Sequence, residues 1–203
     1  MLLTMDEAVI KAMAKWPNVP NVYGWLSLDR RGRWLIKGER ISNPGVVAFI
    51  GRNYSNDEQG RWFFQNGPQR VFVTLEYAPF VIATADADAA SLITHTGQAI
   101  ERVTGAWLDE TGSLLLRCSC GPGLVNDRDL ARVMTSFTDV HGKPIGDATL
   151  ARVLDTEARR HATGLHFRHA GDRLPVGRIQ AAEASLKFGF DPDPRPKEGE
   201  PDC

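Results

Sequence analysis

Apolar and β-branched side chains are densest between residues 60 and 84, where turn-forming residues divide them into short runs. Within 71–77 one face of a two-residue period is wholly apolar, formed by Val71, Val73, Leu75 and Tyr77, and the other face carries Phe72, Thr74 and Glu76. Asn66-Gly67 is a hairpin turn signal because both residues tolerate positive φ, and Pro68, which lacks a backbone donor, should delay strand pairing by one residue. Residues 60–84 therefore predict strand, turn, strand, strand.

Before this stretch the pattern predicts one helix, one hairpin and one short helix. Thr4 and Glu7 form a capping box, and apolar residues then follow at helical spacing to Trp16. Residues 22–29 and 33–38 flank Arg30-Arg31-Gly32 and predict a hairpin with Gly at the position that needs positive φ. The apolar run at 46–54 is too short to type by its period, and we expect a short helix there.

Three loops share the pattern D-x-x-G, because an Asp side chain can accept a hydrogen bond from the backbone two residues on while Gly takes a left-handed conformation. Each should turn the chain into a strand. The unequal spacing favours convergence on one loop chemistry over true repeat ancestry, which stays the alternative. The loops lie at Asp29–Gly32, Asp57–Gly60 and Asp109–Gly112.

After residue 123 the period changes to that of helices. Residues 127–134 and 147–154 match as D-x-x-L-A-R-V-[ML], and each predicts a helix with an N-capping Asp. The linker 138–146 is too long for a helix-turn-helix motif, so we expect a helical pair packed on the sheet. A short strand at 165–168 and a short helix at 181–186 follow.

The fold class predicted by these elements is α+β: an antiparallel β-sheet built from hairpins, with an N-terminal helix and a C-terminal helical pair. We expect residues 1–122 to form the helix-and-sheet domain and residues 123–190 to pack on it. Residues 191–203 contain too little apolar surface to fold alone and should be a flexible tail.

Composition removes several classes of partner. With 203 residues, 42% hydrophobic and 24% charged, the chain has the composition of an ordinary globular protein, and a net charge of −1 provides no overall field to attract DNA or anionic lipid. The N-terminus lacks the pattern of a signal peptide, and no window is apolar enough to span a membrane. We expect a cytoplasmic protein without a membrane partner.

No motif names a reaction. P-loop, G-x-G-x-x-G, G-x-S-x-G, H-E-x-x-H and EF-hand patterns are all missing, so we assign no catalytic residue, cofactor or metal site. Cys118 and Cys120 could place two thiols on one face of a strand, but without C-x-x-C spacing or further ligands we favour a structural role over a redox or metal role. With Cys203 the count is odd, which does not suggest a disulfide framework.

The central turn is the candidate binding site. Amides in a fixed plane beside an Arg and aromatic side chains suit an interface anchor or a small-ligand site, although the same residues also suit an ordinary exposed hairpin. His95 is a weaker candidate, because the sequence places no nucleophile beside it. The candidate residues are Trp62, Gln65, Asn66, Gln69, Arg70 and His95.

The most basic segment, 159–178, is the second candidate. Arg offers bidentate donors to phosphate oxygens, so Arg159, Arg160, Arg168 and Arg173 could contact an anion or nucleic acid. The alternative is a solvated face whose Arg stems cover apolar surface. Clustered guanidinium groups would repel a metal ion.

In residues 23–34, 60–80, 95–97 and 121–130 the chain resembles an uncharacterised family of small proteobacterial proteins of unknown function. The resemblance covers roughly the first 135 residues. It implies a bacterial cytoplasmic protein and transfers no activity, cofactor or catalytic residue.

We therefore favour a non-enzymatic binding or protein-interaction protein, with a protein partner or a homodimer formed through an exposed sheet edge. Nucleic-acid association through 159–178 is the first alternative. The second is an enzyme assembled from distant segments, around His95 with Asp57 or Glu76.

Overall fold

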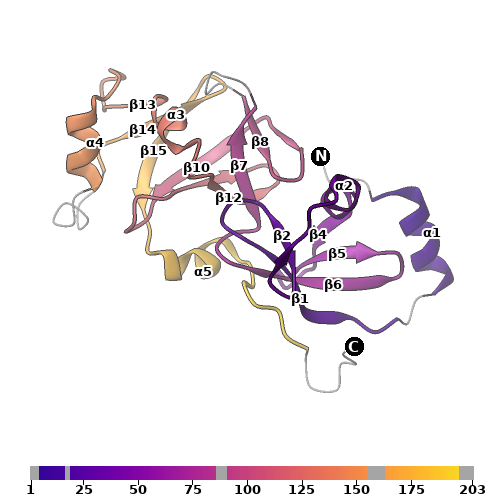
Figure 1. Cartoon of the computed structure of the whole chain (residues 1–203). Helices are drawn as coiled ribbons and strands as arrows, with labels where there is room; N and C mark the ends of the chain where they lie inside the picture. Colours follow the sequence, from indigo (N-terminus) through magenta and orange to yellow (C-terminus); the bar gives the residue numbers. More distant parts are fainter. Residues whose placement is uncertain (1–4, 17–18, 86–90, 155–162, 197–203) are drawn as a thin grey trace. The chain divides into compact units, whose positions relative to one another are not determined.

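The computed structural model describes residues 5–16, 19–85, 91–154 and 163–196 (Figure 1). The chain divides into two compact units. Unit 1 comprises residues 1–79, 95–97 and 185–203, and unit 2 comprises 80–94 and 98–184. Both contain far more sheet than helix, which confirms the α+β class. The domain boundary expected after residue 122 stays a prediction; that residue lies in the strand Gly121–Val125 of unit 2.

Unit 1 is built on a six-stranded sheet with the order β3-β2-β1-β6-β5-β4. Its strands are β1 (Val22–Leu28), β2 (Trp34–Ile36), β3 (Glu39–Arg40), β4 (Tyr54–Asn56), β5 (Trp62–Asn66) and β6 (Gln69–Leu75). Its first two helices are α1 (Glu7–Lys15) and α2 (Pro44–Arg52).

The local predictions for unit 1 are confirmed. β1 and β2 form the expected hairpin, and α2 is the expected short helix. β5 and β6 lie side by side (Figure 1), with Asn66 opposite Gln69, so Gly67-Pro68 makes the turn and pairing starts one residue late. The N-terminal helix begins after an N-cap at Asp6, and Thr4 of the expected capping box lies outside the described residues.

Unit 2 is built on a nine-stranded sheet with the order β13-β14-β15-β10-β11-β12-β7-β8-β9. Its strands are β7 (Phe80–Thr84), β8 (Leu92–Thr94), β9 (Ala99–Ile100), β10 (Val103–Leu108), β11 (Leu114–Cys118), β12 (Gly121–Val125), β13 (Phe137–Thr138), β14 (His166–His169) and β15 (Asp172–Arg178). Its helices are α3 (Leu130–Met134) and α4 (Asp147–Leu154), followed by a 3-10 turn at Ala181–Glu183, whereas α5 (Ala184–Phe188) belongs to unit 1 from residue 185 onward.

Three strand pairs are parallel, which hairpins cannot produce. They are β1 with β6, β7 with β12, and β10 with β15. The sheets are therefore mixed, and the purely antiparallel arrangement that we expected is corrected. Parallel neighbours require long connections, and no local turn signal records them.

The expected helical pair is much reduced. α3 spans only residues 130–134, and Phe137, three residues beyond it, is fully buried in strand β13. The N-cap of α3 is Asp129, not Asp127, and its side chain accepts from the Thr84 hydroxyl at 2.9 Å instead of capping the helix. The repeated sequence pattern that predicted two paired helices therefore folds as the short helix α3, the strand β13 and the helix α4.

The D-x-x-G prediction is confirmed, and a fourth loop joins the three. In each, the Asp Oδ1 accepts from the backbone N–H groups two and four residues later at 2.8–3.0 Å. The glycine has a φ of 74° to 84°. The fourth loop begins at Asp139, inside the segment that the sequence analysis treated as a linker between helices.

The start of the expected flexible tail is held against unit 1. Phe190 is buried, the Asp191 N–H donates to the Gly60 carbonyl at 3.0 Å, and the Leu75 N–H donates to the Pro192 carbonyl at 2.8 Å. The buried aromatic side chain and the two backbone hydrogen bonds together anchor this polar segment. Residues 197–203 lie outside the described part of the chain.

Candidate functional site

An open apolar groove of about 410 Å³ lies within unit 1. It forms on one face of the six-stranded sheet beside α2, and its lining side chains are all uncharged. We call this feature the apolar groove; it is lined by Val22, Trp25, Leu26, Ile36, Val46, Ile50, Phe64, Asn66, Gln69 and Val71.

A bulge in β1 turns an aromatic side chain toward the groove. The pairing of β1 with β6 shifts register between Val22 and Leu26, and Gly24 within the bulge has φ +69°. Trp25 stays 46% exposed and lines the groove. The Lys37 N–H donates to the Trp25 carbonyl at 2.8 Å, and the Lys37 Nζ lies 3.8 Å from the Trp25 ring centroid.

Helix α2 forms one wall. Asn43 caps its first turn, with Oδ1 accepting from the backbone N–H groups of Gly45 at 2.9 Å and Val46 at 3.2 Å. Val46 and Ile50 are four residues apart, so both project from one face of the helix into the groove lining. Val46 is 42% exposed while Ile50 is buried, so this wall of the groove is exposed to solvent at Val46 and shielded from it at Ile50.

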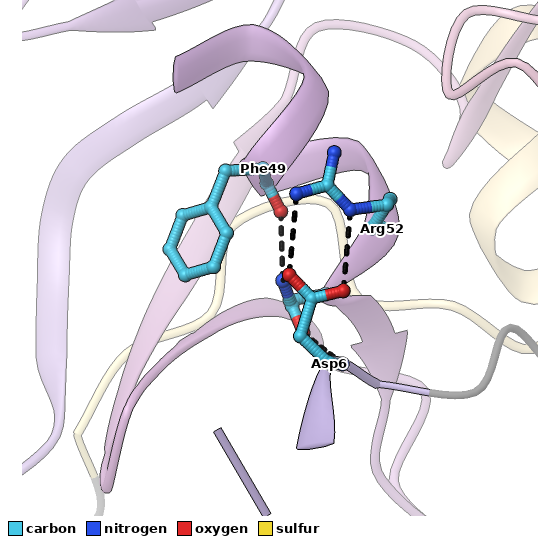
Figure 2. Close-up of polar contacts among 4 residues, drawn as sticks. Asp6, Phe49 and Arg52 are labelled. Carbon is cyan, nitrogen blue, oxygen red and sulfur yellow. Dashed lines mark hydrogen bonds and ion pairs between the residues drawn. The ribbon is translucent and has the colours of Figure 1, made fainter. Parts of the chain in front are cut away.

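The C-terminal end of α2 is fixed to the start of α1 by a small polar network. Figure 2 shows the Arg52 guanidinium facing the Asp6 carboxylate, with two contacts of 3.2 Å. The Asn53 side chain donates to the Phe49 carbonyl at 3.0 Å and accepts from the Asp6 N–H at 2.9 Å. Hydrogen bonds from Arg52 and Asn53 lower the pKa of Asp6. The network holds one groove wall in place.

Strands β5 and β6 form another part of the groove lining, because alternate side chains of a strand lie on the same face of the sheet. Phe64 and Asn66 share one face of β5, and Gln69 and Val71 share the same face of β6. The Gln69 Nε2 donates to the Pro20 carbonyl at 3.0 Å, and Asn66 is exposed at the turn. Two of the six predicted binding residues therefore line the groove.

Alternation explains why Gln65 and Arg70 do not line the groove, because they face the other side of the sheet. Gln65 is 1% exposed, and its Nε2 donates to the Gly67 carbonyl at 2.9 Å, while its buried Oε1 has no partner among the described residues. The Arg70 guanidinium lies 4.6 Å from the Phe63 ring centroid. Trp62 shares the face of Phe64 and Asn66 but is absent from the groove lining, and its buried ring lies 4.9 Å from the Tyr54 ring. These three residues support the sheet.

His95 also packs as a structural residue and does not line the groove. His95 is half-buried with its Nε2 shielded from solvent, and its ring lies 5.1 Å from Trp34 and 5.9 Å from Tyr54 between centroids. Burial lowers the pKa of His95 to about 3, and the Asp29 carboxylate only partly opposes this. The carboxylates we expected beside it are engaged elsewhere: Asp57 with Arg61 at 2.7 Å, and Glu76 with the Arg30 N–H at 3.0 Å.

The basic segment is only partly described. Arg159 and Arg160 lie outside the described residues, whereas Arg168 and Arg173 are exposed and directly opposite each other on the β14–β15 hairpin. The Arg173 Nη2 donates to the Asp139 carbonyl at 2.6 Å. Within the described residues, no group of three His, Cys, Asp or Glu side chains could hold a metal ion. No described helix is long and apolar enough to cross a membrane.

Sequence reasoning missed Trp25, Ile36 and Val46, three exposed apolar residues of the groove. A partial signal was present at Gly24, because a glycine inside an alternating run indicates a bulge that redirects its neighbours. Nothing local indicates that α2 leaves part of the sheet face uncovered.

Comparisons with known proteins identify a family and a fold. The DUF2944 family model, described as "Protein of unknown function (DUF2946)", matches residues 5–195. The chain is similar to the crystal structure of a DUF1285 family protein from Silicibacter pomeroyi DSS-3, with 17% identity and a TM-score of 0.50 over 89% of this chain and 100% of that chain. A DUF1285 family protein from Shewanella baltica OS155 matches with 18% identity and a TM-score of 0.39 over 52% of this chain and 86% of that chain. No curated protein matches.

Proposed function

The chain belongs to the DUF2944 family, as its resemblance to an uncharacterised family led us to expect, and from its geometry we propose that it is a non-enzymatic binding protein that takes an apolar small molecule in the groove. The observation that carries the proposal is the concentration of exposed apolar side chains there. Trp25, Ile36 and Val46 are 46%, 47% and 42% exposed and line one hollow. A contiguous exposed apolar surface of this kind marks a binding site more often than scattered single residues do.

The size and chemistry of the groove support a small ligand. Its volume of about 410 Å³ falls in the range of roughly 300–1,000 Å³ that ligand sites occupy. Covering apolar surface contributes about 25 cal/mol for each Å² removed from water. Asn66 and Gln69 at one end provide amide groups that can orient a polar end of the ligand.

The mutational test needs one substitution inside the groove and one outside it. Val46→Trp fills the groove from the α2 wall. Val140→Trp is the matched control, because Val140 is also an exposed valine, 56% accessible, but sits in the Asp139 loop of unit 2. Circular dichroism should confirm that both variants remain folded.

The neutral fluorescent probe N-phenyl-1-naphthylamine provides the binding measurement. We expect the wild type and Val140→Trp to bind with equal affinity, and Val46→Trp to bind at least about tenfold more weakly, because a filled pocket loses on the order of 1.4 kcal/mol or more of binding free energy. Quenching of Trp25 should accompany binding. Equal affinity for all three proteins would refute the groove as the binding site.

A second copy of the chain is the competing occupant, as expected for a homodimer. Light scattering distinguishes the two, because a groove closed by a partner protomer would make the wild type a dimer and Val46→Trp a monomer. A monomeric wild type that binds the probe supports the small-molecule proposal.

A further inference from the structure

The β11–β12 turn brings two free thiols together in unit 2. Cys118 pairs with Gly121, so Ser119 and Cys120 form a two-residue turn. Cys118 is 6% exposed in the hydrophobic core, and Cys120 packs partly buried against the same core. Each thiol also shifts the pKa of the other.

We propose that Cys118 and Cys120 form a redox-active dithiol that a hydroperoxide converts to a disulfide across this turn. A β-turn holds its first and last α-carbons within about 7 Å. Residues 118 and 120 are two positions apart, so their α-carbons lie at most about 7.6 Å apart, a distance that overlaps the range of about 4.4–6.8 Å that the α-carbons of disulfides span. The site needs no residue from outside unit 2.

The environment gives the two thiols different tasks. The hydrogen bond with Cys118 lowers the pKa of Cys120, while the same bond and burial raise the pKa of Cys118. Cys120, the more exposed of the two, is therefore the thiolate that attacks, because the thiolate is the nucleophilic form. Cys118 keeps its proton until it resolves the product.

The reaction balances in two steps. The Cys120 sulfur attacks one peroxide oxygen, an S–O bond forms, the O–O bond breaks, and the other oxygen leaves as an alcohol or water after taking a proton. The Cys118 sulfur then attacks the Cys120 sulfur, the S–S bond forms, and the sulfenic oxygen leaves as water with the Cys118 proton. Two thiols lose two electrons and two protons, and one hydroperoxide is reduced.

A ring this small should open again readily. The stabilisation that a disulfide provides grows with the length of the loop it closes, and here the loop contains only three residues. Labile disulfides are the regulatory or catalytic ones. Reduction by a dithiol reagent should restore both thiols.

The first test is made on full-length protein with Cys203→Ser, which removes the third thiol and leaves residues 118 and 120 native. One equivalent of hydrogen peroxide should consume both thiols together, and intact-mass spectrometry should show the loss of two hydrogen atoms, reversed by dithiothreitol. Peptide mapping should place the bond between residues 118 and 120. Gain of one oxygen on one thiol, with the other still reactive, would overturn the proposal.

Variants then separate the roles. In Cys118→Ala, Cys120 cannot be resolved, so dimedone labelling of its sulfenic acid should rise by about tenfold over the parent protein. In Cys120→Ser, peroxide consumption should fall by a similar factor. Equal labelling of the parent and Cys118→Ala would show that Cys118 is not the resolving thiol, and the measurement on the native pair stands even if Cys118→Ala fails to fold.

Discussion

The carbonyl oxygen of Gly189 lies against Gly60, in the place where the β-carbon of any other residue would be. Phe190 Cα is 3.0 Å from that same position, and the Asp191 N–H donates to the Gly60 carbonyl at 3.0 Å. Gly60 also has φ +74°. Position 60 therefore requires glycine both for its conformation and for the approach of the chain at 189–191.

Gly60→Ala should destabilise unit 1 by more than its backbone conformation alone explains. Gly142→Ala is the matched control, because Gly142 sits in the same kind of loop at φ +84° with no atom near its β position. We expect Gly142→Ala to lower the free energy of unfolding by about 1–2 kcal/mol, and Gly60→Ala by about 3 kcal/mol or more. Denaturant titration measures both. Equal losses of unfolding free energy in the two variants would show that the Gly189 carbonyl moves away from a β-carbon without an energetic cost.

His95 should make stability depend on pH through its imidazole, whose Nε2 is shielded from solvent. Its pKa is about 3 in the folded chain and about 6.5 when unfolded, so below pH 6.5 the unfolded state binds the extra proton. Stability is then complete above that pH and falls toward pH 3, by up to about 1.4 kcal/mol per pH unit. His95→Phe keeps an aromatic ring and should remove this component. A difference between the two proteins that is the same at every pH would contradict the neutral state of His95.

The hairpins were predictable because their signals are local. Asn66-Gly67-Pro68 and the D-x-x-G loops determine where the chain turns within a few residues, and the structure follows them. The fourth such loop, at Asp139, carries the same D-x-x-G signal between the two copies of the helical repeat. Parallel pairs such as β1 with β6 depend on contacts distant in sequence, and no local pattern encodes them.

Only a part of the candidate site was predictable, for the same reason. Asn66 and Gln69 were identified from their place at the turn, yet alternation decides which neighbours share their face, and Gln65 and Arg70 fall on the other one. Trp25 joins them only because β1 pairs in parallel with β6. The groove is a product of sheet order, which turn chemistry does not reveal.

Arg168 provides a test of the nucleic-acid alternative. It is exposed and opposite Arg173, so the pair concentrates positive charge on one hairpin. If this hairpin contacts phosphate, Arg168→Ser should reduce the slope of log affinity against log salt for a generic oligonucleotide by about 1. Arg128→Ser, which removes an exposed Arg elsewhere in unit 2, should leave the slope unchanged. Equal changes of slope in the two variants, or no binding of the oligonucleotide at low salt, would rule out nucleic-acid association through this hairpin.

Gln65 and Asn66 are adjacent amides that should behave in opposite ways. Gln65→Ala removes a buried side chain that donates to the Gly67 carbonyl, so it should lower the free energy of unfolding by about 1–3 kcal/mol. Asn66→Ala changes an exposed side chain at the groove end and should alter stability by less than about 0.5 kcal/mol. Probe binding should reverse the order, because only Asn66 lines the groove. Denaturant titration and probe titration on the same two variants measure these effects. Weaker probe binding by the folded Gln65→Ala protein, with Asn66→Ala unaffected, would place the binding site on the other face of the sheet.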